Sequence, residues 1–140
     1  MSRFLLDTNI LVFLVSGEND CISSEVASII EDYNNQLFVS SVGVLELLQL
    51  YRIGKIRLKN YKDAYQLQVA IEKDYFIKII PFSKEYLNIL SKLKIADGHN
   101  DPFDHSILST AIADKLTLVS SDRQFENYTT QNLNFAFNKR

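Results

Sequence analysis

The chain has 140 residues, 46% of them hydrophobic and 23% charged, which excludes an intrinsically disordered protein and predicts one domain over residues 1–140. Its formal net charge of −2 argues against broad electrostatic capture of nucleic acid, and the sequence contains no run of about 18 uncharged apolar residues that could span a membrane. A single cysteine excludes an internal disulfide and favours a reducing compartment, so we expect a cytoplasmic protein without membrane contact.

Strand and helix patterns alternate along the first half of the chain. In order, we predict a strand at 4–6, a helix at 8–15, a helix through EVASIIEDY capped by Ser23 or Ser24, a strand at 37–40, and a helix through VGVLELLQLY capped by Ser41 and ended by Gly54.

The alternation continues in the second half. We predict a helix at about 61–74, a strand at 76–80 stopped by Pro81, a helix through KEYLNILSKLK capped by Ser83, a helix from Asp101 to about Asp114, a strand at 116–120 and a candidate fifth strand at 134–137. Short β-branched or aromatic strands that alternate with helices are typical of an α/β domain. We therefore expect a central, mainly parallel sheet of four or five strands flanked by helices.

Acidic residues follow two of the predicted strands directly. Asp7 comes after RFLL and Asp122 comes after TLVSS, and ligands of parallel sheets bind outside the carboxyl ends of the strands. Each residue also has an ordinary structural explanation, because Asp7 could cap the next helix and Asp122 could open a turn through DRQF.

Glu46 is an acid within a strongly apolar helical segment, VGVLELLQL. The residues three and four positions away include no cation that could pair with it along the helix. A charged group in such a segment is costly unless something compensates it, although simple exposure at the surface is the alternative.

The stretch GHNDPFDHSILSTAIADK carries two aspartates at the beginning of a helix. Asp101 is placed as the N-cap and Pro102 as the first helical residue, and a carboxylate at Asp104 suits the positive end of the helix dipole. Asp104 also shares its helix face with apolar residues, as Glu46 does. The two aspartates therefore either start the helix together, or one of them holds a metal ion.

Together, Asp7, Glu46, Asp104 and Asp122 predict a site for a hard cation. Carboxylate oxygens suit Mg²⁺ or Mn²⁺. Mg²⁺ usually binds one or two protein carboxylates, which leaves coordination positions for water and phosphate. Without a cation the four charges would repel one another, at a cost of roughly 4 kcal/mol for each pair about 4 Å apart at an effective dielectric of about 20.

Four motifs in this order, FLLDTNILVFL, SSVGVLELLQL, DPFDHSILSTAIA and TLVSSDRQF, resemble the PIN domain, and in size the VapC-type toxins of bacterial toxin–antitoxin pairs. The resemblance covers nearly the whole chain and implies a PIN-like fold. It also implies a Mg²⁺- or Mn²⁺-dependent endoribonuclease whose products carry 5′-phosphate and 3′-hydroxyl ends.

The same resemblance implies roles for particular residues. Asp7 and Asp104 would be the main metal ligands, and Glu46 and Asp122 would act through water or a second ion. The supporting residues by this match are Thr8 and Asn9, which would orient Asp7 or a bound water, and Asp101, mainly as a helix cap.

The resemblance further implies an RNA substrate, a cognate antitoxin laid across the helices near 42–54 and 61–74, and a homodimer. The alternatives are a PIN nuclease in RNA maturation or turnover without an antitoxin, or a catalytically inactive binding module. A phosphotransferase of the haloacid dehalogenase type would need a second aspartate where Asn9 stands.

The basic run YRIGKIRLKNYK is either a solvated surface or a contact for phosphates or an acidic partner.

Both histidines lie near the DPFD motif. His105 replaces the arginine that often follows this motif in the family, and we expect a surface residue of the helix, with a phosphate contact as the alternative. His99 is expected to be an ordinary loop residue.

Overall fold

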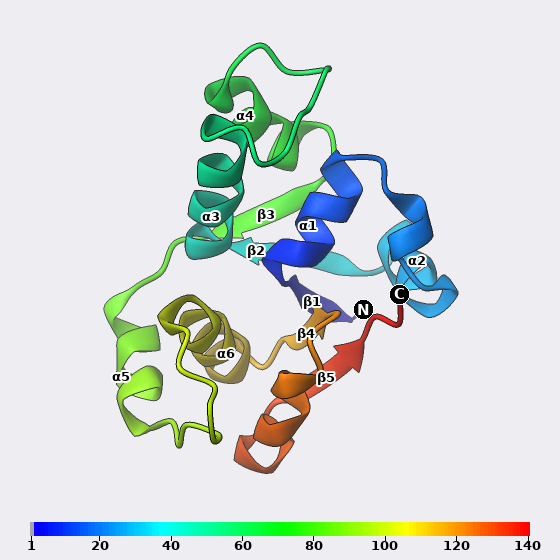
Figure 1. Ribbon diagram of the computed structural model, residues 1–140. Helices are drawn as coiled ribbons and strands as arrows, with labels where there is room; N and C mark the ends of the chain where they lie inside the picture. The colour runs from blue at the N-terminus through cyan, green and yellow to red at the C-terminus, as the bar shows by residue number, and fades with distance from the viewer. Residues whose placement is uncertain (1) are drawn as a thin grey trace.

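The computed structural model describes residues 2–140, which form one five-stranded sheet in the order β3-β2-β1-β4-β5 (Figure 1). Every neighbouring pair is parallel, and the candidate fifth strand is present. The predicted α/β class with a parallel sheet is therefore confirmed. The strands are β1 (Arg3–Leu6), β2 (Gln36–Ser40), β3 (Ile77–Ile80), β4 (Thr117–Ser120) and β5 (Asn134–Phe137).

Helices connect the strands, and within residues 2–140 none of them is long and apolar enough to cross a membrane. Two segments not expected from the sequence are 3₁₀ helices, at Asn19–Cys21 and Arg123–Gln131. The α-helices are α1 (Thr8–Val15), α2 (Ser24–Glu31), α3 (Ser41–Arg52), α4 (Ala64–Lys73), α5 (Lys84–Lys92) and α6 (Pro102–Asp114).

Side-chain caps explain where several helices begin, and they correct two predictions. Ser40, not Ser41, caps α3, because its hydroxyl accepts a hydrogen bond from the Val42 N–H at 3.1 Å. The helix predicted from residue 61 begins only at Ala64, where the Asp63 carboxylate accepts from the Gln66 N–H. Both caps satisfy amides that have no partner within the helix.

Two further boundaries differ for local reasons. The strand predicted at 76–80 starts at Ile77, because Phe76 has a φ of 57°, in the left-handed region that interrupts an extended strand. Ser83 stands at the N-cap position of α5 as predicted, but its side chain makes no capping hydrogen bond.

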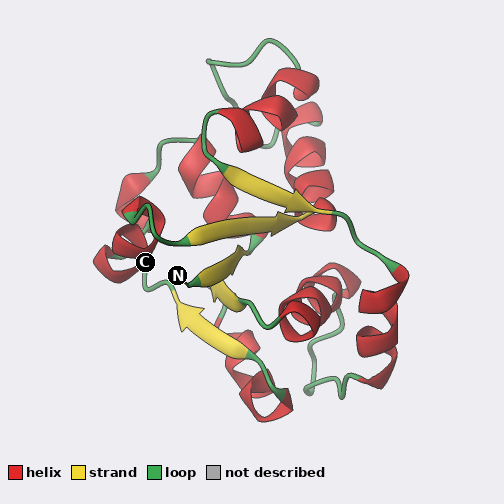
Figure 2. Cartoon of the chain, turned by 180° about the vertical axis from the view of Figure 1, so that it is seen from behind, coloured by secondary structure: helices red, strands yellow, loops and turns green. Residues whose placement is uncertain are grey.

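The sheet buries different side chains on its two faces, as the alternation of a pleated strand requires. One face carries Leu6 and Val119 into a core with α1 to α4, and the other carries Leu5 and Leu118 into a core with α6 and the 3₁₀ segment 123–131. Figure 1 shows α1 in front of the sheet, and in Figure 2 the strands lie in front of that helix.

The strand order creates a divergence between β1 and β4. The chain passes from β1 to β2 to β3 in one direction, and then crosses back through α5 and α6 to β4, on the other side of β1. Connections that leave neighbouring strands in opposite directions open a crevice at the carboxyl ends of those strands. The topology therefore places a binding crevice beside Asp7 and Asp122.

The cap of α6 gives a testable consequence. The Asp101 carboxylate accepts a hydrogen bond from the Phe103 N–H at 2.9 Å. Asp101→Ala should lower the free energy of unfolding by about 1 kcal/mol, whereas Asp101→Asn, which can still cap, should lower it by only a few tenths. Urea denaturation of both variants and the wild type measures this, and equal losses in the two variants would show that charge, not capping, is what Asp101 contributes.

Candidate functional site

An open cleft of about 420 Å³ lies at the carboxyl ends of β1 and β4. Apolar side chains of Val12, Phe13 and Leu50 form part of its wall, and the polar wall is strongly acidic. The carboxylates that line the cleft are Asp7, Glu46, Asp101, Asp104 and Asp122. The four acids expected from the sequence therefore converge on one cleft, and their catalytic role remains a prediction.

Asp7 is the most buried of these acids, with 6% of its surface exposed. Its backbone N–H donates to the Val119 carbonyl at 2.9 Å, which ties the residue to β4. Its Oδ1 accepts from the Thr8 N–H at 2.8 Å, so Asp7 also caps α1. The capping explanation considered from the sequence is thus correct, and it coexists with a position in the cleft.

Ser120 joins two of the acids, and no pattern in the sequence indicated it. Its hydroxyl donates to Asp7 Oδ2 at 2.6 Å and accepts from the Asp122 N–H at 3.0 Å. Asn9 Nδ2 also donates to Asp7 Oδ2, at 3.2 Å, in agreement with the expectation that Asn9 orients Asp7. These contacts hold the Asp7 carboxylate from the end of β4 and from the first turn of α1.

The pKa of Asp7 is raised to about 7, mainly by burial and to a lesser extent by the charges of Asp104 and Glu46. The hydrogen bonds from Ser120 and Thr8 act in the opposite direction and are outweighed. The free-energy cost of removing the ionised carboxylate from water therefore exceeds the stabilisation that its hydrogen bonds provide.

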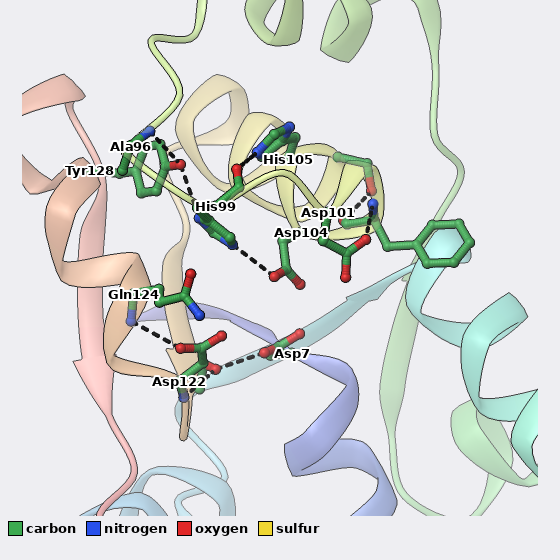
Figure 3. A network of polar contacts seen from close by, with 12 residues as sticks. Asp7, Ala96, His99, Asp101, Asp104, His105, Asp122, Gln124 and Tyr128 are labelled. Carbon is green, nitrogen blue, oxygen red and sulfur yellow. Dashed lines mark hydrogen bonds and ion pairs between the residues drawn. The ribbon is translucent and has the colours of Figure 1, made fainter.

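Asp104 lies in the first turn of α6 and makes a contact that sequence reasoning missed. Its Oδ2 lies 2.8 Å from Nε2 of His99, a residue with only 3% of its surface exposed (Figure 3). Burial raises the pKa of Asp104, and the hydrogen bond from His99 opposes that rise. No local pattern could have found this pair, because His99 sits in a loop with no helical or strand periodicity around it.

Asp122 and Glu46 reach the cleft from different elements. Asp122 caps the 3₁₀ segment that follows β4, with its Oδ1 accepting from the Gln124 N–H at 2.9 Å, so the expected turn is also present. Glu46, on α3, is half-buried and lines the cleft. Figure 3 shows the carboxylates of Asp7, Asp104 and Asp122 directed toward a shared space.

His105 differs from both sequence-based expectations. It is buried, with 7% of its surface exposed, and its Nε2 lies 2.7 Å from the His99 carbonyl oxygen. It is therefore neither a surface residue of the helix nor a phosphate contact. Its neighbours on α6 pack into the core, so the whole of this helix face turns inward.

The donor set fits a divalent cation. Within residues 2–140 no lysine or arginine forms an ion pair with any of the four acids, so their charge is not neutralised by the protein. Ligand atoms of His99, Asp104 and Asp122 lie within 4.8 Å of one another. Thr8 also lines the cleft, and its Oγ1 is buried without a hydrogen-bond partner in the described chain. A divalent ion would offset the repulsion between the carboxylates.

The chain is similar to known proteins over nearly its whole length. A family model described as the PIN domain matches residues 4–130. No protein with a curated description matches. Among solved structures, the chain is similar to one in VapBC2 from Rickettsia felis bound to a DNA fragment from its promoter, with 24% identity, a TM-score of 0.66, and coverage of 98% of this chain and 99% of that one.

Two more solved structures have the same fold at lower identity. A chain of VapBC-1 from nontypeable Haemophilus influenzae is 18% identical with a TM-score of 0.64, and 96% of this chain and 97% of that chain are covered. A chain of VapBC-5 from Mycobacterium tuberculosis is 14% identical with a TM-score of 0.63, and the coverage is 98% and 99%.

The pKa of Asp7 makes the stability of the metal-free protein depend on pH. Because the folded-state pKa is raised from 3.8 to about 7, the contribution of Asp7 is fully present below about pH 4 and is lost as the pH rises through about 7. The loss is up to about 4 kcal/mol. Asp7→Asn cannot titrate, so the free energy of unfolding of the wild type should fall relative to this variant between about pH 4 and about pH 7 in EDTA. Parallel pH curves for the two proteins would contradict the raised pKa.

Proposed function

The chain belongs to the PIN domain family, and on that premise we propose that it is a Mg²⁺- or Mn²⁺-dependent endoribonuclease, formed as one domain over residues 1–140. The observation that carries the proposal is the convergence of Asp7, Glu46, Asp104 and Asp122 on one cleft, with no cation of the described chain paired to them. Such a site attracts a divalent ion and, through it, a phosphate.

The protein's own residues have distinct tasks in this proposal. Asp7 and Asp104 hold the ion, and Glu46 and Asp122 hold waters or a second ion. Ser120 and Asn9 fix the direction of the Asp7 carboxylate through their hydrogen bonds to Oδ2. A divalent ion bound there would neutralise the phosphate and lower the pKa of a water.

The open shape of the cleft supports a single-stranded substrate. Its apolar wall of Val12, Phe13 and Leu50 offers a surface for bases beside the acids that hold the phosphate. Arg140 also lines the cleft, with its guanidinium 5.7 Å from the centre of the Phe13 ring, and it supplies a positive charge near the incoming backbone.

The biological role we propose is that of the toxin of a toxin–antitoxin pair. The similar structures include a toxin–antitoxin complex from Klebsiella pneumoniae and a member of the VapBC family of toxin–antitoxin systems from Mycobacterium tuberculosis. A partner surface is supported by α3 and α4, which line an open groove of about 520 Å³.

Side chains of these two helices divide between the core, the groove, which Leu45 lines, and a separate hollow, which Tyr65 lines. Leu47 and Leu67 are fully buried, whereas Leu45 and Tyr65 are 56% and 72% exposed. Exposed apolar side chains beside a groove suit an antitoxin segment of apolar character. We further propose that the chain forms a homodimer.

Cleavage of RNA tests the central proposal. Purified protein should cut single-stranded RNA in Mg²⁺ or Mn²⁺, should stop in EDTA, and should leave 5′-phosphate and 3′-hydroxyl ends. Asp7→Asn and Asp104→Asn should each lower the rate by more than about 100-fold, because loss of a direct ligand exceeds the 10–100-fold loss typical of its supporting groups. Glu25→Gln, an exposed acid of α2, is the matched control and should cleave normally. Robust cleavage in EDTA would rule out the mechanism.

Expression in bacteria tests the toxin role separately. The wild-type chain should arrest growth without its antitoxin, and Asp7→Asn or Asp104→Asn should relieve the arrest while the protein remains folded by circular dichroism. Glu25→Gln should arrest growth as the wild type does. Cleavage in vitro with no effect on growth would favour a nuclease of RNA maturation or turnover instead.

A further inference from the structure

His99 occupies a buried position between α5 and α6 that its loop sequence did not indicate. Its ring lies 5.4 to 5.6 Å, centre to centre, from the rings of His105, Phe125 and Tyr128, each in an edge-on arrangement. Its backbone is held as well, because His105 Nε2 is bonded to the His99 carbonyl oxygen. This packing leaves the imidazole one orientation, with Nδ1 toward Tyr128 and Nε2 toward Asp104.

The hydroxyl of Tyr128 decides which ring nitrogen of His99 carries the proton. Tyr128 is fully buried, and its oxygen accepts a hydrogen bond from the Ala96 N–H at 3.1 Å. Within residues 2–140, the other polar atom bonded to this hydroxyl is His99 Nδ1, at 2.9 Å. A buried O–H without an acceptor is costly, so the Tyr128 proton goes to Nδ1. Nδ1 is then the acceptor, and Nε2 carries the proton of the neutral ring.

The protonated Nε2 donates to Asp104 Oδ2 at 2.8 Å. In the part of the chain that the structure describes, this is the only hydrogen bond of the Asp104 carboxylate, so Oδ1 remains free. Figure 3 shows the Asp104 carboxylate in contact with His99 and directed toward the space that Asp7 and Asp122 also face. A series of hydrogen bonds therefore connects the Ala96 amide, through Tyr128 and His99, to Asp104 in the cleft.

We propose that His99 and Tyr128 are positioning residues that fix the Asp104 carboxylate for metal binding. This inference rests on the proposed function, because it assumes that Asp104 is a metal ligand. His99 donates to one oxygen and leaves the other for the ion, and Tyr128 keeps His99 in the tautomer that can donate. Groups that hydrogen-bond to a metal ligand set its orientation and basicity.

Direct binding of the ion by His99 is the competing arrangement, since its ring lies within 4.8 Å of ligand atoms of Asp104 and Asp122. A ligating Nε2 would need its lone pair, and Nδ1 would then carry the proton and face the Tyr128 hydroxyl. That hydroxyl would lose its acceptor inside the core. The hydrogen-bond inventory therefore assigns His99 to the support of Asp104.

Two amide substitutions separate the two contacts of the ring. Glutamine at position 99 can place an N–H near the position of Nε2, whereas asparagine reaches only about as far as Nδ1. In an EPR titration with Mn²⁺, His99→Gln should keep the dissociation constant within about threefold of the wild type, and His99→Asn should raise it by about 10- to 100-fold. Thermal melts of both variants in EDTA measure any loss of packing separately.

Spectroscopy tests the two remaining steps. Electron spin-echo modulation of bound Mn²⁺ should show no ¹⁴N coupling from a directly bound imidazole. The ¹⁵N spectrum of His99 should show the proton on Nε2 in the wild type, because Nδ1 accepts from the Tyr128 hydroxyl and Nε2 donates to Asp104. Strong ¹⁴N coupling that disappears in His99→Gln, or a wild-type His99 ring with its proton on Nδ1, would overturn the assignment.

The outcomes distinguish this inference from the proposed function. A wild type that binds no Mn²⁺ and cleaves no RNA would overturn the metal-dependent nuclease itself. A wild type that binds Mn²⁺ while His99→Asn binds it equally well would overturn only the positioning role of His99.

Discussion

The parallel pairing of β1 with β4 is the constraint on which the site depends. It brings together strands that are more than a hundred residues apart in the sequence, and it is closed at its carboxyl end by the Asp7 N–H bonded to the Val119 carbonyl. The Ser120 hydroxyl then reaches Asp7 Oδ2 across the two strands. Because the chain leaves these strands toward opposite sides, the same pairing opens the cleft that the acids line.

Helix capping and the chemistry of the cleft use the same carboxylates. Asp7, Asp101 and Asp122 are each the N-cap of the helix that follows, and each accepts a backbone N–H through Oδ1. Asp7 and Asp122 cap helices that begin just after β1 and β4, so capping alone already places two acids at this edge of the sheet. The burial of Asp7 and of Asp104 goes further than capping requires, and it is the main cause that raises the pKa of each acid.

The hydrophobic core that includes α6 also supports residues of the acidic cleft. Phe125 and Tyr128 belong to the same core as residues of α6 and the sheet, and their segment begins at the cap formed by Asp122. The same aromatic side chains surround His99, which contacts Asp104. A disturbance of this core would therefore reach the acids of the cleft, because one 3₁₀ segment contributes both a cleft carboxylate and the aromatic support.

The sequence by itself determined the strands, most helix starts and the acids at the strand exits, since these follow from local periodicity, capping residues and the rule that parallel strands end together. It did not reveal His99, Ser120 or the burial of His105. Their partners are set by packing: His99 meets Tyr128 across 29 positions, and Ser120 meets Asp7 across 113. A hydrogen bond over such a separation leaves no periodic trace in the chain. Only the tertiary structure, which decides which loop lies under which helix, could turn a lone loop histidine into the support of an acid.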